Sequence, residues 1–173
     1  IRRHVDEPEI WKKSAGENKD LTSRSGLREI FRRPLLKATL VTTAMNAGTM
    51  FAWWGLFTWI PAYLGLPPEQ GGMGLSIVTT STWIIVMQVG MWLGYVSFGF
   101  ICDRVGRKKT YISYLFTAAA LVILYSSVRQ NTVLLLLGPL VAFFGTGYFS
   151  GFGTITAEIF PTRIRASAQG FTY

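Results

Sequence analysis

The sequence has very few of the residues that build most enzyme sites. It contains one cysteine, Cys102, and one histidine, His4. A single cysteine excludes an intrachain disulfide and a thiolate metal cluster. No Cys–His pair, Ser–His pair, carboxylate pair or metal-ligand spacing can be assembled from the residues present. We therefore expect a protein that is not an enzyme and that binds no metal and no cofactor.

Charged residues are also scarce, and they are unevenly distributed. They make up 15% of the chain; residues 1–37 contain ten Lys or Arg, whereas residues 38–101 contain none and only one acid, Glu69. Half of the residues are apolar, which is too many for an ordinary soluble domain of this length. The net charge of +8 would suit nucleic acid, but the cations gather at the ends of apolar stretches. The composition predicts an all-α membrane protein whose partner is the lipid bilayer, with no nucleic acid.

Four apolar stretches are long enough to cross the hydrocarbon core of a bilayer, which takes about 20 helical residues. They cover approximately residues 35–63, 74–102, 110–128 and 133–157, and a fifth, incomplete stretch covers residues 166–173. The charged residues 1–34 are predicted to form a cytoplasmic linker. Short amphipathic helices within it, at residues 8–13 and 26–33, would either lie on the membrane surface or belong to a solvated tether.

The basic residues also predict the orientation of the chain in the membrane. If residues 1–34 are cytoplasmic, all seventeen Lys and Arg except Arg129 lie on the cytoplasmic side, as the positive-inside rule requires. Aromatic residues crowd the second half of the first span, where a belt at the opposite interface is expected. The sequence thus predicts an integral, multi-pass protein of the plasma membrane.

A compact charged turn, Gly-Phe-Ile-Cys-Asp-Arg-Val-Gly-Arg-Lys-Lys at residues 99–109, separates the second and third spans. Asp103, at the end of an uncharged helix, can accept hydrogen bonds from the N-terminal amides of a neighbouring helix. Gly99 allows a close approach of another helix, and Gly106 allows a sharp turn.

The spacing of this turn resembles the signature loop of the major facilitator superfamily. In that superfamily the loop is a cytoplasmic latch that holds the two halves of the transporter together in the outward-facing state. The alternative is a positive turn that only sets the orientation. The resemblance implies a latch role for the following residues: Gly99, Asp103, Arg104, Gly106, Arg107 and Lys108.

A second motif, Glu-Ile-Phe-Pro-Thr-Arg-Ile-Arg at residues 158–165, follows the fourth span. It resembles the Glu-x-Phe-Pro-Thr-x-x-Arg loop of sugar porters, organic-ion transporters and sialate- or lactate-type symporters. Pro161 ends the helix and leaves Glu158 in the last turn, where the helix dipole disfavours an anion unless a cation balances it. We expect a cytoplasmic charge network of Glu158, Arg163 and Arg165, with Arg107 as a further possible partner. The alternative is a surface ion pair worth under ~1 kcal/mol.

Polar and aromatic side chains within the spans predict a substrate cavity. In the superfamily, the helices that correspond to the first and fourth spans line the central cavity. The resemblance thus assigns Asn46, Trp53 and Tyr148 to substrate, whereas a Thr146, Ser150, Thr154 stripe faces the other side of the fourth span. Gln88 in the second span is either a further cavity residue or a hydrogen-bonding contact between helices. Two Gly-x-x-x-Gly pairs, at residues 90–94 and 147–151, predict close helix packing.

In combination, the motifs and spans resemble the C-terminal half, without its last helices, of a twelve-helix secondary transporter that works by alternating access. The resemblance implies a small-molecule substrate and, as partner, the N-terminal half of the same polypeptide. Because amides that could bind sugar hydroxyls are few, we expect an organic acid, either a monocarboxylate or an aromatic acid. The alternatives are a sugar-porter-type hexose transporter and a channel or non-transporting scaffold subunit. We also expect a proton-coupled symporter, whose titrating group the N-terminal half must supply because no Asp, Glu, His, Lys or Arg lies at depth in any of the four spans.

Overall fold

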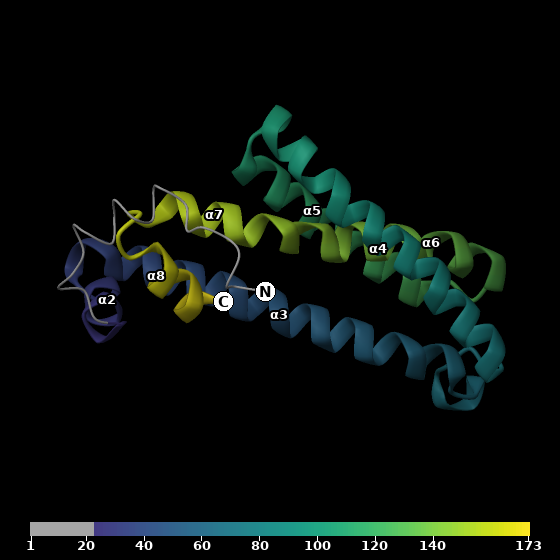
Figure 1. Cartoon of the computed structure of the whole chain (residues 1–173). Helices are drawn as coiled ribbons and strands as arrows, with labels where there is room; N and C mark the ends of the chain where they lie inside the picture. The colour runs from purple at the N-terminus through teal and green to yellow at the C-terminus, as the bar shows by residue number, and fades with distance from the viewer. Residues whose placement is uncertain (1–22) are drawn as a thin grey trace, which may run out of the picture. The chain divides into compact units, whose positions relative to one another are not determined.

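The computed structural model describes residues 23–173, and most of this part of the chain is helical (Figure 1). Within it no β-strand occurs, so the predicted all-α fold is confirmed. The elements are α2 (Ser23–Ile30), α3 (Arg33–Gly65), η2 (Pro68–Gln70), α4 (Ile77–Val105), α5 (Arg107–Ser127), α6 (Asn131–Thr146), η3 (Gly147–Gly151), α7 (Phe152–Ile159) and α8 (Arg165–Thr172). The amphipathic helix expected at residues 8–13 lies outside the described residues.

Among the described residues, three helical segments are long and apolar enough to cross a membrane: Ile77–Val105, Arg107–Ser127 and Asn131–Ile159. They correspond to the second, third and fourth predicted spans. The first predicted span is the 33-residue helix α3. It is not among the segments that are apolar enough, because Thr, Trp and Gly dilute its aliphatic residues. Its passage through the membrane stays a prediction.

Backbone geometry explains why the second span begins at Ile77 rather than at residue 74. Gly71 and Gly74 have φ angles of 84° and 66°, in the left-handed region that favours glycine. Ser76 then caps α4, because its hydroxyl accepts a hydrogen bond from the backbone N–H of Thr79 at 3.2 Å. The loop between α3 and α4 therefore ends in a defined helix start.

Small residues bring α4 and α6 into direct backbone contact. A Cβ atom added to Gly90 would collide with the backbone of Pro139, and one added to Gly94 with the carbonyl oxygen of Phe143. At Gly147 an added Cβ would lie 2.8 Å from the carbonyl oxygen of Gly94. The predicted close packing at both Gly-x-x-x-Gly pairs is thus confirmed.

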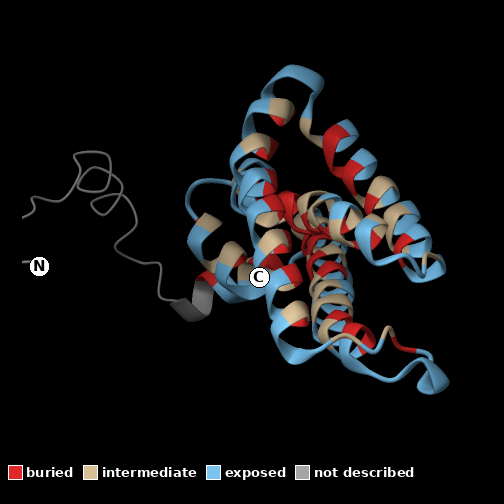
Figure 2. Cartoon of the chain, turned by 90° about the vertical axis from the view of Figure 1, so that its right-hand side faces the viewer, coloured by how far each residue is buried: buried red, intermediate tan, exposed pale blue. Residues whose placement is uncertain are grey.

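The described part of the chain divides into two compact units, residues 47–155 and residues 23–46 with 156–173. In the unit of residues 47–155, buried apolar side chains from α3, α4, α5 and α6 form one core; its members include Ile60, Leu64, Met87, Tyr125, Leu134 and Val141. Buried positions recur along the helices, and the opposite faces are exposed (Figure 2). This pattern is expected of helices that have lipid or further helices as neighbours.

The other unit contains α2, the first part of α3 and residues 156–173. Ile30 of α2 is fully buried against Phe160, Ile164 and Ala168. The hydroxyl of Thr39 donates a hydrogen bond of 2.7 Å to the carbonyl oxygen of Ile30. Helix α2 is therefore packed and is not part of a plain solvated tether. Its position at the membrane surface stays a prediction.

Candidate functional site

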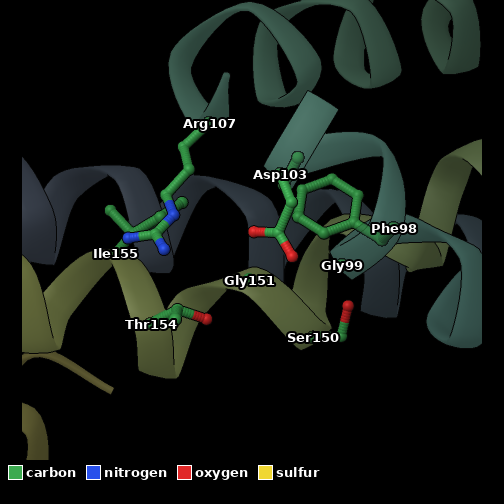
Figure 3. A pocket seen from close by; sticks show the side chains of 9 residues that line it. Phe98, Gly99, Asp103, Arg107, Ser150, Gly151, Thr154 and Ile155 are labelled. Carbon is green, nitrogen blue, oxygen red and sulfur yellow. The ribbon is translucent and has the colours of Figure 1, made fainter. Parts of the chain in front are cut away.

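The charged turn between α4 and α5 faces a small pocket, which we call the motif pocket. Its volume is about 160 Å³, and its lining consists of Phe98, Gly99, Cys102, Asp103, Arg107, Ser150, Gly151, Thr154 and Ile155 (Figure 3). The side chains of Asp103 and Arg107 point from the turn toward the η3–α7 segment. The structure thus brings together two predicted latch residues and two hydroxyl residues, Ser150 and Thr154.

Gly106 makes this arrangement possible. Its φ and ψ angles are 95° and 141°, a conformation that side-chain-bearing residues rarely adopt. Its N–H donates to the carbonyl oxygen of Cys102 at 2.9 Å and closes α4, and α5 begins at the next residue, Arg107. The chain therefore reverses within one residue and places Arg107 next to Asp103.

The other predicted latch residues lie around the pocket. Gly99 is exposed, and a Cβ added there would meet no atom of the described chain. Arg104 and Lys108 are exposed and do not line the pocket. The open surface at Gly99 leaves room for the close approach of another helix, as predicted for a latch. The latch role itself stays a prediction.

The second motif lies in the unit that contains α2. Glu158 is exposed in the last turn of α7, and Arg165 is the first residue of α8. The guanidinium of Arg163 forms an ion pair with the carboxylate of Glu29 in α2. Sequence reasoning missed Glu29. The available signal was that Glu29 is the only acid between Asp20 and Glu69, in a stretch with five cations.

A second cavity, which we call the aromatic cavity, lies within the unit of residues 47–155. Its volume is about 450 Å³, and its lining consists of Ala52, Trp53, Leu56, Leu115, Ala118, Ala119, Val122, Ile123, Gly145 and Tyr148. The structure thus places two of the predicted substrate residues, Trp53 and Tyr148, in one lining. Neither an acid nor a base is present in it, so the lining suits an apolar or ring-shaped group.

Aromatic rings continue behind this lining. Phe149 stacks on Tyr148 with ring centroids 4.9 Å apart and meets Trp53 edge-to-face at 5.9 Å. Tyr111 meets Tyr148 at 5.7 Å. Sequence reasoning did not select Phe149 or Tyr111, because their proximity depends on the 3₁₀ segment η3, which interrupts the fourth predicted span.

The other two predicted substrate residues do not line the aromatic cavity. Gln88 is exposed on α4. The amide nitrogen of Asn46 donates a hydrogen bond of 2.7 Å to the carbonyl oxygen of Thr172, which joins α3 to α8. Of the stripe on the opposite side of the fourth span, Thr146 is buried and bonds to the carbonyl oxygen of Ala142, while Ser150 and Thr154 line the motif pocket.

Apolar helices of membrane-spanning length, joined by a charged turn that reverses at a glycine, define the class of this protein as a helical integral membrane protein. The chain belongs to the Major Facilitator Superfamily, whose model matches residues 2–173. This match confirms the family resemblance of the two motifs.

Relatives of this chain are named as transport proteins. It is 28% identical over its whole length to a Haemophilus influenzae protein provisionally named as a metabolite transport protein. It is also 28% identical over its whole length to a probable 4-methylmuconolactone transporter of Cupriavidus pinatubonensis. Over 98% of its length it is 27% identical to the cis,cis-muconate transport protein of Acinetobacter baylyi. None of these names is that of an enzyme, in agreement with the prediction from the sequence.

The chain spans about two fifths of the length of these relatives, at 42%, 39% and 41%. No solved structure matches it. Among residues 23–173 there is no group of three or more His, Cys, Asp or Glu side chains that could hold a metal ion. The expectation that the protein uses no metal or cofactor stays a prediction.

Proposed function

We propose that this chain is part of a secondary active transporter that carries a small organic acid across the plasma membrane by alternating access. The observation that carries the proposal is the likeness to relatives named for 4-methylmuconolactone and cis,cis-muconate transport. Both compounds are small and unsaturated and have oxygen-rich groups. We therefore expect a substrate that has a carboxylate and an unsaturated or ring portion.

The aromatic cavity supports this substrate class. Trp53 and Tyr148 are the aromatic residues of an otherwise aliphatic lining, and aromatic side chains favour flat, unsaturated groups. Because no cation lines the cavity, the carboxylate of the substrate needs a countercharge from the rest of the polypeptide. Asn46 and Gln88 would contribute to substrate binding only in the complete transporter.

The motif pocket supports the alternating-access part of the proposal. Asp103 and Arg107 share one pocket, and the exposed Gly99 beside them offers a surface for a helix of the other half. In our proposal, Asp103, Arg104, Arg107 and Lys108 hold the outward-facing state. Glu158, Arg163 and Arg165 form charge contacts that change when the protein turns inward.

We propose further that transport is coupled to protons and that the titrating group lies outside this chain. Residues 110–128 and 130–157 contain no charged residue or histidine, and residues 38–102 contain only Glu69, in the loop between α3 and α4. Proton relays need an ionisable group at depth in the membrane. The rest of the polypeptide would have to supply it.

The test is uptake by the full-length protein reconstituted in liposomes with an imposed pH gradient. We expect saturable uptake of cis,cis-muconate or benzoate, competition by other organic acids, and loss of accumulation when an uncoupler abolishes the gradient. Saturable hexose uptake that ignores organic acids would refute the substrate class. Flux that rises linearly with concentration would indicate a channel and refute the transport mechanism.

A further inference from the structure

A groove between α2 and α8 plays no part in the proposed transport mechanism. It has a volume of about 570 Å³ and is lined by Leu27 of α2 and by Ala166, Ser167, Gly170 and Phe171 of α8. The two helices lie against each other (Figure 1). Leu27 and Phe171 are 41% and 43% exposed. The groove is thus an open, largely apolar surface on a packed pair of helices.

Helix α2 has three different sides around its axis. Residues four apart share a side, because a helix turns by about 100° per residue. Gly26 and Ile30 are buried, and the next side carries Leu27, which is followed four residues later by the partly exposed Phe31. The ring of Phe31 meets that of Phe171 edge-to-face at 4.9 Å. The third side carries the exposed Arg28.

Positive charge is concentrated beside this apolar side. Residues 23–37 contain five Lys or Arg and one acid, Glu29. The exposed cations are Arg28, Arg32, Arg33 and Lys37. Glu29 does not neutralise them, because it is paired with Arg163. Four exposed cations therefore lie close in sequence to the exposed side chains of Leu27 and Phe31, from α2 to the beginning of α3.

We propose that this surface binds an anionic phospholipid of the surrounding leaflet. An acyl chain lies in the groove along Leu27 and Phe171, and the headgroup phosphate meets Arg28 and Arg32. A strip of apolar residues beside a cluster of cations is typical of a helix that lies in the membrane interface.

Other occupants fit this surface less well. An acidic soluble partner would match the cations but would leave the groove without an apolar occupant. A second copy of the same surface would bring like charges together. The proposal rests on membrane integration and not on the identity of the transported substrate.

Native mass spectrometry of the full-length protein tests the proposal, with phosphatidylglycerol and phosphatidylcholine as the two lipid probes. The Arg28→Gln/Arg32→Gln variant should weaken phosphatidylglycerol binding by about fivefold for each charge removed and leave phosphatidylcholine binding unchanged. The Arg28→Lys/Arg32→Lys variant should keep phosphatidylglycerol binding. Leu27→Asn should weaken the binding of both lipids, since it alters the acyl-chain groove.

The control is Lys109→Gln, which removes one exposed cation from α5 instead of from residues 28–32. It should leave the binding of both lipids unchanged. A loss of about fivefold in phosphatidylglycerol binding by Lys109→Gln, equal to the loss per charge in the double Arg variant, would overturn the proposal, since binding would then follow net charge. Unchanged binding in Leu27→Asn would also overturn it, because another part of the protein would then cover the groove. Melting temperatures of all variants identify any that fail to fold.

Discussion

The carboxylate of Glu29 forms an ion pair with the guanidinium of Arg163, which lies 134 residues further along the chain. The pair ties α2 to the loop between α7 and α8. Beside it, the fully buried Ile30 packs against Phe160 and Ile164. A segment of the expected cytoplasmic linker is thus fixed to one of the two motif loops by an apolar contact and by a charge contact.

The charge contact should contribute little to stability. Arg163 is 52% and Glu29 21% exposed, so solvent screens the pair. We expect Glu29→Gln or Arg163→Gln to lower the free energy of unfolding by under ~1 kcal/mol. A double-mutant cycle on the full-length protein in detergent would measure the coupling. The same variants should change transport more than stability if the pair opens and closes during the cycle.

Lys109→Gln provides the control for the loss of one cytoplasmic charge. The charge-reversed pair Glu29→Arg/Arg163→Glu should restore the transport lost in the single variants. If all single variants transport at the unsubstituted rate, the pair has no role in the cycle. A coupling energy well above 1 kcal/mol would show that the pair is less screened than its exposure indicates.

We expect the contact between α4 and α6 to tolerate substitution far less well than the Glu29–Arg163 ion pair does. In Gly90→Ala the new methyl group would collide with the backbone of Pro139, which cannot rotate away as a side chain could. We expect a loss of about 1–3 kcal/mol in the free energy of unfolding, typical of overpacked sites. Gly65→Ala is the matched control, because a Cβ at this last residue of α3 would meet no atom of the described chain. A stable Gly90→Ala protein would mean that the two helices can separate without cost.

Removal of the carboxylate at the motif pocket should change the conformational equilibrium. If Asp103 complements the terminus of a helix in the other half, Asp103→Asn should weaken the outward-facing state by roughly 0.3–2 kcal/mol. Such a change shifts a two-state equilibrium severalfold. We expect slower transport with unchanged substrate binding, and greater accessibility of cysteine probes on the cytoplasmic side. Unchanged probe accessibility would argue that the charged turn only sets orientation.

The sequence predicted the helices and the α4–α5 turn well, because both depend on local properties. Uncharged length determines where a helix can cross the membrane, and Gly106 alone permits the reversal before Arg107. Partners distant in sequence were harder to predict. Nothing local to Arg163 identifies Glu29, and the bond from Asn46 to Thr172 depends on the packing of α3 against α8. The 3₁₀ segment η3 was also missed, because a glycine-rich helix and a 3₁₀ turn have the same composition.

The aromatic cavity gives the most direct test of substrate selection. Trp53 lines the cavity, whereas its neighbour Trp54 is 63% exposed and does not. If the ring of Trp53 stacks on an unsaturated substrate, Trp53→Leu removes a contact worth about 0.5–1.5 kcal/mol beyond buried area. The dissociation constant for cis,cis-muconate or benzoate should then rise by roughly two- to tenfold. A saturated acid of similar size, such as adipate or cyclohexanecarboxylate, should lose much less affinity.

Trp54→Leu serves as the control. It should leave the ratio of the affinities for unsaturated and saturated acids unchanged, since it removes the same kind of side chain from the exposed face of α3. Equal losses for saturated and unsaturated acids in Trp53→Leu would show that the residue only fills space. A change in affinity in Trp54→Leu alone would indicate that the substrate binds at the exposed face of α3 and not in the aromatic cavity.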